Sequence, residues 1–147
     1  MAGEEHEFVV VRVDEGEVAG ENWVYTWIDA DRVVYVGATG LDPRTRVWLH
    51  LNDPDPDVGR IRARFDGLST ATLEVLAMRV PEAIPRAEVR DVLGARLAEE
   101  GLLRADAITD HLQLPLESSP ETYEVVERYV ARLRSHLGEQ GARAPLA

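Results

Sequence analysis

The chain has 147 residues, 45% of them hydrophobic, which is enough to bury one core, so we expect a single domain. Its net charge of −11 argues against a general nucleic-acid binder, because affinity for a polyanion comes largely from cationic phosphate contacts. The absence of cysteine excludes disulfides, thiolate nucleophiles and cysteine-ligated zinc, and leaves histidines and carboxylates as metal ligands.

The first strand-like runs are residues 7–13, 23–28 and 32–37, which are apolar and rich in β-branched and aromatic side chains. Only three residues separate the last two runs, a spacing typical of an antiparallel hairpin. A three-residue loop would place Tyr25 directly opposite Tyr35 on one face of the sheet. A two-residue loop would place the two tyrosines on opposite faces.

A helix is predicted next, because Asp42 and Pro43 form an N-cap followed by proline at the first helical position. It would extend to about Leu51 and place Arg46 and His50 four residues apart on one face. A short helix is expected around residues 58–65.

The second half of the chain predicts one strand and two helices. Residues 69–80 are predicted to form a long strand that ends at Pro81, with Leu73, Val75 and Ala77 on one face and Glu74, Leu76 and Met78 on the other. Pro85 opens a helix to about Glu100, and a second helix begins near Pro120; both have apolar positions at helical spacing. The segment from 101 to 117 is predicted to be irregular.

These elements predict an α+β fold: a small antiparallel sheet of three to four strands flanked by helices. Residues 1–140 would form one domain with an extra N-terminal strand, and residues 141–147 a flexible tail. No run of 18 apolar residues occurs and the first residues are acidic, so we expect no membrane span, no signal peptide and a cytoplasmic protein.

The pattern Trp23-Val24-Tyr25, then Tyr35-Val36-Gly37, then Arg46 and His50, resembles the core of the GIY-YIG nuclease family. That resemblance implies a bacterial-type endonuclease, dependent on magnesium or manganese, acting on DNA or a related phosphodiester. Tyr25 would act as the base, and Tyr35 and Arg46 would hold water or phosphate, with His50 one helical turn further on.

The remaining candidate residues are predicted to bind phosphate or metal. Gly37 and Thr39 precede a predicted helix start, where backbone amides could face an anion, and Arg44 competes with Arg46. The family pattern points to Glu88 as the metal ligand, with Asp91 as the alternative. Neither has an arginine three or four residues away, so a divalent cation would relieve their repulsion; acids near a helix start can equally interact with the helix dipole.

A second interpretation stays open, in which the fold is retained, catalysis is lost, and the protein binds a ligand or a protein partner. Buried strand tyrosines commonly have satisfied hydroxyls without any catalytic role. The net charge also implies that any nucleic acid is bound weakly. His6, His111 and His136 lack the spacing of a metal site and are predicted to be surface residues.

Overall fold

The structure is a computed structural model that describes residues 9–13, 22–40, 50, 53–55, 73–109, 111–113 and 117–143. Within these residues the chain forms strands and helices in the order β1 (Val9–Val13), β2 (Trp23–Asp29), β3 (Arg32–Thr39), β4 (Leu73–Arg79), α3 (Arg86–Glu99), β5 (Leu103–Ile108) and α4 (Pro120–Arg143). The predicted helix over 58–65 and most of the predicted helix from Asp42 to Leu51 lie outside the described residues.

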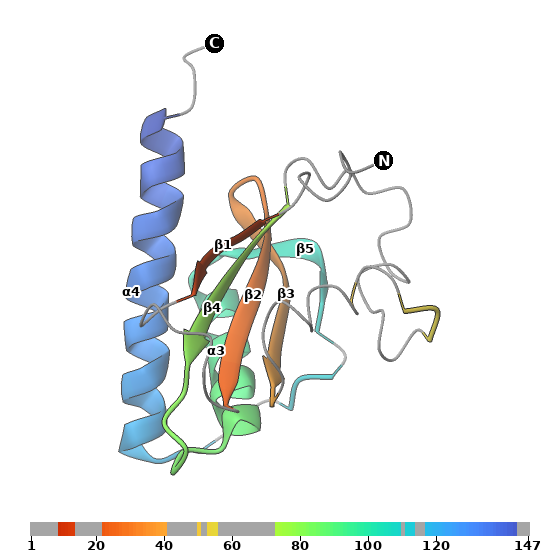
Figure 1. Ribbon diagram of the computed structural model, residues 1–147. Coiled ribbons are helices and arrows are strands. Elements are labelled where there is room, and N and C mark those ends of the chain that lie inside the picture. Colours follow the sequence, from red (N-terminus) through yellow and green to blue (C-terminus); the bar gives the residue numbers. More distant parts are fainter. Residues whose placement is uncertain are drawn as a thin grey trace.

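The described strands form one five-stranded sheet in the order β1-β4-β2-β3-β5 (Figure 1). Its three central strands, β4, β2 and β3, are antiparallel, whereas β1 is parallel to β4 and β5 is parallel to β3. The predicted α+β class, with a small sheet flanked by helices, is confirmed. The sheet is mixed rather than wholly antiparallel, and the N-terminal strand lies at its edge.

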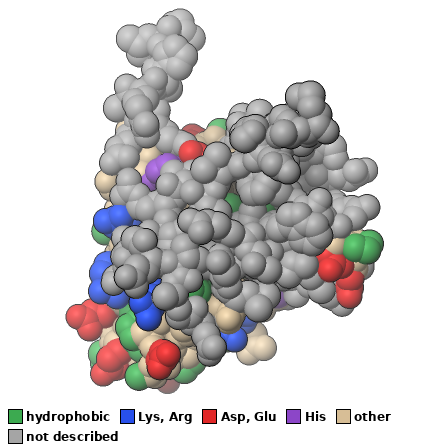
Figure 2. Space-filling model, in the orientation of Figure 1, with side chains coloured by type: hydrophobic (Ala, Val, Ile, Leu, Met, Phe, Trp, Pro, Cys, Tyr) green, Lys and Arg blue, Asp and Glu red, His purple; other side chains and the backbone are tan. Residues whose placement is uncertain are grey.

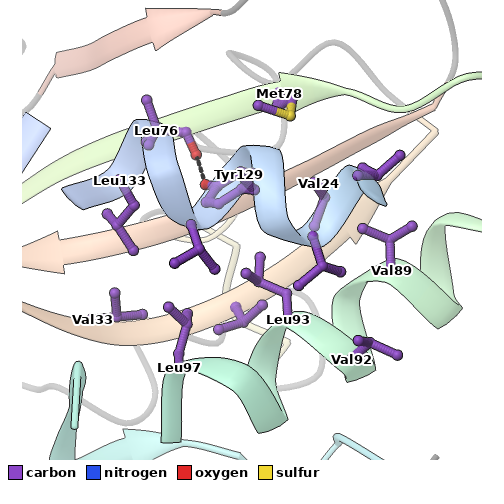
Figure 3. Close-up of a cluster of buried hydrophobic side chains, with 14 of the residues drawn as sticks. Val24, Val33, Leu76, Met78, Val89, Val92, Leu93, Leu97, Tyr129 and Leu133 are labelled. Carbon is purple, nitrogen blue, oxygen red and sulfur yellow. Dashed lines mark hydrogen bonds between the residues drawn. The ribbon is translucent and has the colours of Figure 1, made fainter. Parts of the chain in front are cut away.

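One face of the sheet packs against α3 and α4. Figure 3 shows Val24, Val33, Leu76 and Met78 of the strands meeting side chains from both helices. The predicted apolar positions of the helices lie in this core: Val89, Val92, Leu93, Leu97, Val126, Tyr129, Val130 and Leu133. The helical periodicity in the sequence therefore identified the inner faces of α3 and α4 correctly.

Two polar side chains, Tyr129 and Thr26, form hydrogen bonds within this apolar core. Tyr129 of α4 donates a hydrogen bond to the carbonyl oxygen of Leu76 at 2.5 Å (Figure 3), and the Thr26 hydroxyl lies 2.8 Å from the Tyr129 hydroxyl. Because the carbonyl can only accept, the threonine donates to the tyrosine oxygen. Burial raises the pKa of Tyr129 well above its ordinary value.

Strand β5 falls in the segment predicted to be irregular, and that prediction is wrong. Helix α3 ends with Gly101 in the left-handed region at a φ of 70°, and the Leu102 amide donates to the Leu97 carbonyl at 2.9 Å. The Val33 amide then donates a hydrogen bond to the Leu102 carbonyl at 2.8 Å, which directs the chain alongside β3. The strand therefore forms because a tertiary partner is available, although its alternating charged and alanine residues favour no strand.

The helix predicted from Pro120 is confirmed and extends to Arg143, three residues into the segment predicted as a tail. Residues 144–147 lie outside the described residues. Neither described helix combines the length and the apolar character that crossing a lipid bilayer requires.

Candidate functional site

The turn between β2 and β3 differs from the predicted three-residue loop. Asp29 pairs with Arg32, so the turn consists of Ala30 and Asp31, and Ala30 has the left-handed φ of 58° that tight two-residue turns favour. Arg104 of β5 forms an ion pair with Asp29 and so ties β5 to this turn. A turn of this length alone would place Tyr25 and Tyr35 on opposite faces of the sheet.

A β-bulge in β3 returns Tyr25 and Tyr35 to the same face of the sheet. Ile28 pairs with Val33 but Trp27 pairs with Tyr35, so Val34 is an extra residue in β3. Tyr25 consequently lies opposite Gly37 and diagonal to Tyr35, rather than directly opposite it as predicted.

The two tyrosines are nevertheless neighbours on one face. Both belong to the buried cluster on the side of the sheet away from α3 and α4. Their ring centroids are 6.0 Å apart and the ring planes are inclined at 38°. The predicted placement of both side chains on the same face is therefore confirmed, although the predicted register is wrong.

Gly37 lets both rings lie directly over the backbone of β3. A Cβ atom at this position would be 2.5 Å from the Tyr25 hydroxyl oxygen and 2.7 Å from a ring carbon of Tyr35. Such distances are far below van der Waals contact. The sequence predicted that an anion would bind near Gly37; in the structure the tyrosine rings occupy the space over this residue.

His50 completes a buried group of side chains with the two tyrosines. Its Nε2 atom is 2.7 Å from the Tyr25 hydroxyl oxygen, and its ring lies edge-on to that of Tyr35 with centroids 4.8 Å apart. The exposed fractions of Tyr25, Tyr35 and His50 are 2%, 3% and 0%. Three of the four predicted catalytic residues are thus in mutual contact in a dry environment.

The other residues predicted to lie around the tyrosines are Thr39, Arg44 and Arg46. Thr39 is buried and pairs with Trp23, which places it on the same face as Tyr25. Arg44 and Arg46 lie outside the described residues.

The predicted metal ligands Glu88 and Asp91 lie on α3, which packs against the opposite face of the sheet from Tyr25 and Tyr35. The buried Asp91 carboxylate forms an ion pair with Arg90, Nε to Oδ1 2.8 Å, so the prediction that both acids lack a neutralising arginine is wrong for Asp91. In the described part of the chain, no three histidines or acids lie close enough to share a metal ion.

The prediction that His6, His111 and His136 are surface residues is wrong for His136, which is buried, and for His111, which is half-buried; His6 lies outside the described residues. His136 is 3% exposed, with its Nε2 atom 3.3 Å from Oε1 of Glu74, and His111 stacks on the ring of Tyr35. His136 follows Tyr129 by seven positions, so the periodicity of α4 could have identified it as inward-facing. No local pattern marks His111, whose position depends on β5.

Comparisons of this chain with protein-family models, with curated proteins and with solved structures give no match.

Proposed function

We propose that the protein is a phosphodiesterase of the GIY-YIG type, an endonuclease that hydrolyses DNA or a related phosphodiester in the bacterial cytoplasm. The observation that supports this proposal most is the 2.7 Å contact between the Tyr25 hydroxyl and Nε2 of His50, on the face that also holds Tyr35. A tyrosine hydroxyl hydrogen-bonded to an imidazole can act as the base that activates water, because the imidazole can accept the phenol proton.

The proposed chemistry is a proton relay from water through Tyr25 to His50, in which the neutral imidazole accepts the phenol proton across the 2.7 Å contact. In the proposed reaction, Tyr25 takes a proton from the attacking water as its own proton moves to His50. The water oxygen bonds to phosphorus, the bond to the leaving ester oxygen breaks, and solvent protonates that oxygen.

The remaining site residues have supporting roles in this proposal. Tyr35 holds the water or the phosphate, and Arg46 stabilises the charge that develops on the phosphate oxygens, with Arg44 as its competitor. Thr39 and the backbone amides that follow Gly37 bind the phosphate.

Dependence on magnesium or manganese belongs to the proposal on the family resemblance alone. Glu88 and Asp91 are on a helix that covers the other face, and Asp91 is already paired with Arg90, so the described residues do not assemble a metal site beside Tyr25. A single carboxylate can hold magnesium through its water shell, and the family resemblance points to Glu88, which lies on α3 across the sheet from Tyr25. The proton transfers above involve only Tyr25, His50, water and solvent.

The burial of the tyrosines favours a second candidate function, a catalytically degenerate domain that binds a ligand or protein. At exposed fractions of 2%, 3% and 0%, Tyr25, Tyr35 and His50 could meet a phosphate only if this face opened. The surface charge is consistent with a protein partner. Figure 2 shows several of the described basic side chains on the side formed by α4. Two ion pairs link α4 to α3: Arg96 of α3 pairs with Glu127 of α4, and Arg134 of α4 pairs with Glu100 at the end of α3.

A cleavage assay with a matched variant separates the two candidates. Purified protein with magnesium or manganese should nick supercoiled plasmid at low salt. His50→Gln can still hydrogen-bond to Tyr25 but cannot accept its proton, so we expect the rate to fall by about a hundredfold or more. Wild-type protein that never cleaves would favour the binding module, and equal cleavage by the variant would remove His50 from the mechanism.

The metal ligand is tested in the same assay. Glu88→Gln should abolish metal-dependent cleavage, whereas Asp91→Asn should retain it if Arg90 already neutralises Asp91. The reverse result would assign the metal to Asp91, and two active variants would place it elsewhere.

A further inference from the structure

His111 reaches the tyrosine face from the end of β5. Ile108 pairs with Tyr35 as the last residue of that strand, and a turn follows in which the Leu112 amide donates to the Thr109 carbonyl at 3.0 Å. This turn brings the imidazole of His111 parallel to the Tyr35 ring, with centroids 4.9 Å apart and an angle of 20° between the planes. The contact is a stacked pair of rings.

The imidazole of His111 is fixed by a hydrogen bond as well as by stacking. Its Nε2 atom is 2.7 Å from the carbonyl oxygen of Val36, the residue that follows Tyr35. Since a carbonyl can only accept, Nε2 must carry the proton in this contact. The orientation of the ring is therefore tied to the backbone beside the tyrosine that it stacks on.

The neighbouring residue anchors the segment to α3. The side chain of Leu112 packs directly against Gly94, where a Cβ atom would be 2.5 Å from a terminal methyl carbon of the leucine. Gly94 is buried in the middle of α3, so Leu112 fills a notch in that helix. His111 is thus held by the β5 pairing on one side and by this contact on the other.

Tyr35 contacts two imidazoles as a result. His111 stacks on its ring, and His50 contacts it edge-on at 4.8 Å and 65°. His50 also contacts Tyr25, so Tyr35 and the backbone of β3 connect His111 to the Tyr25–His50 pair.

We infer that His111 is a positioning residue for Tyr35: it sets the orientation of the phenol in the site without touching the substrate. The catalytic consequence rests on the proposed function, whereas the effect on the Tyr35 ring does not. Misplacing a reacting or orienting group by about 1 Å can lower a rate by about a hundredfold, so loss of the stacked ring should be measurable in turnover.

The kinetic test compares His111→Ala with His111→Phe, which keeps a ring to stack on Tyr35. We expect His111→Ala to lower kcat by about tenfold or more with KM within about twofold, and His111→Phe to recover most of the loss. His136→Ala, which removes a buried histidine from α4, controls for general destabilisation and should leave kcat unchanged. In a Tyr35→Phe background, His111→Ala should have little further effect because both changes act at one group.

An NMR measurement tests the inference without requiring activity. In the wild type, ¹⁵N shifts should show the Nε2-protonated tautomer of His111, and the Tyr35 ring should flip slowly. His111→Ala should accelerate the flips and shift the Tyr35 signals; if it does not fold, His111→Gln makes the same comparison. Unchanged Tyr35 signals, or additive kinetic effects with Tyr35→Phe, would overturn the inference. Altered signals in a protein that never cleaves phosphodiesters would refute the proposed function and leave the positioning role intact.

Discussion

The two faces of the central sheet are both buried but differ in chemistry. The face toward α3 and α4 is aliphatic, and its one tyrosine among the clustered side chains, Tyr129, is hydrogen-bonded to a backbone carbonyl and a threonine. The other face holds Trp23, Tyr25, Trp27 and Tyr35, with His50 in contact with three of these rings. A core needs only volume and apolar surface, whereas the second face holds a phenol beside an imidazole that could exchange a proton with it.

The largest expected effect on stability is on the helix-covered face. Leu93 is fully buried between α3 and the sheet, so Leu93→Ala should lower the free energy of unfolding by about 2–5 kcal/mol. Chemical denaturation measures this loss. Cleavage per folded molecule should stay at the wild-type level, and a large loss of activity in the folded fraction would show that the two faces are not independent.

A smaller loss of stability is expected on the tyrosine face. Gly37→Ala would place a methyl group 2.5 Å from the Tyr25 hydroxyl, and we expect a cost of about 1–3 kcal/mol as the rings move. The same substitution at Gly138 of α4 meets no atom within 4 Å and should be neutral or stabilising by up to about 1 kcal/mol. Thermal melts of the two variants compare a crowded glycine with an open one, and equal shifts would contradict the close packing over Gly37.

The smallest expected effect is a dependence of stability on pH at Tyr129. Burial raises the pKa of Tyr129, so the folded protein holds this proton more tightly than the unfolded chain does. Its contribution is complete below the unfolded pKa of about 10 and is lost as the pH rises above that value. Between pH 9 and pH 11, the free energy of unfolding measured by chemical denaturation should fall less for Tyr129→Phe than for the wild type. Identical losses would mean that Tyr129 is accessible to solvent.

The helices and the central strands could be predicted from the sequence because the patterns that indicate them are local. Apolar spacing fixed the inner faces of α3 and α4, and the alternation of residues 73–79 fixed the faces of β4. The bulge at Val34 could not be predicted, because an extra residue within the continuous apolar run Val33–Val36 changes no local pattern. The shared face of Tyr25 and Tyr35 was therefore predicted from a loop that does not exist, and the bulge compensates for the error.

The candidate site was predictable only where its residues share a strand or a motif. Tyr25, Tyr35, Gly37 and His50 come from the hairpin and the segment after it, and the structure places them together. His111 comes from an edge strand that forms only by pairing with β3, so no spacing in the sequence connects it to Tyr35.

The most direct test of the difference between the faces is one chemical change made on each of them. Tyr25 and Tyr129 are both buried tyrosines with hydrogen-bonded hydroxyls, so Tyr25→Phe and Tyr129→Phe each remove a single oxygen. Each should lower the free energy of unfolding by about 1 kcal/mol. In single-turnover plasmid cleavage with magnesium, we predict that Tyr25→Phe lowers the rate by about a hundredfold or more, while Tyr129→Phe stays within about twofold of the wild type. Equal rates for the two variants would contradict the assignment of Tyr25 as the base.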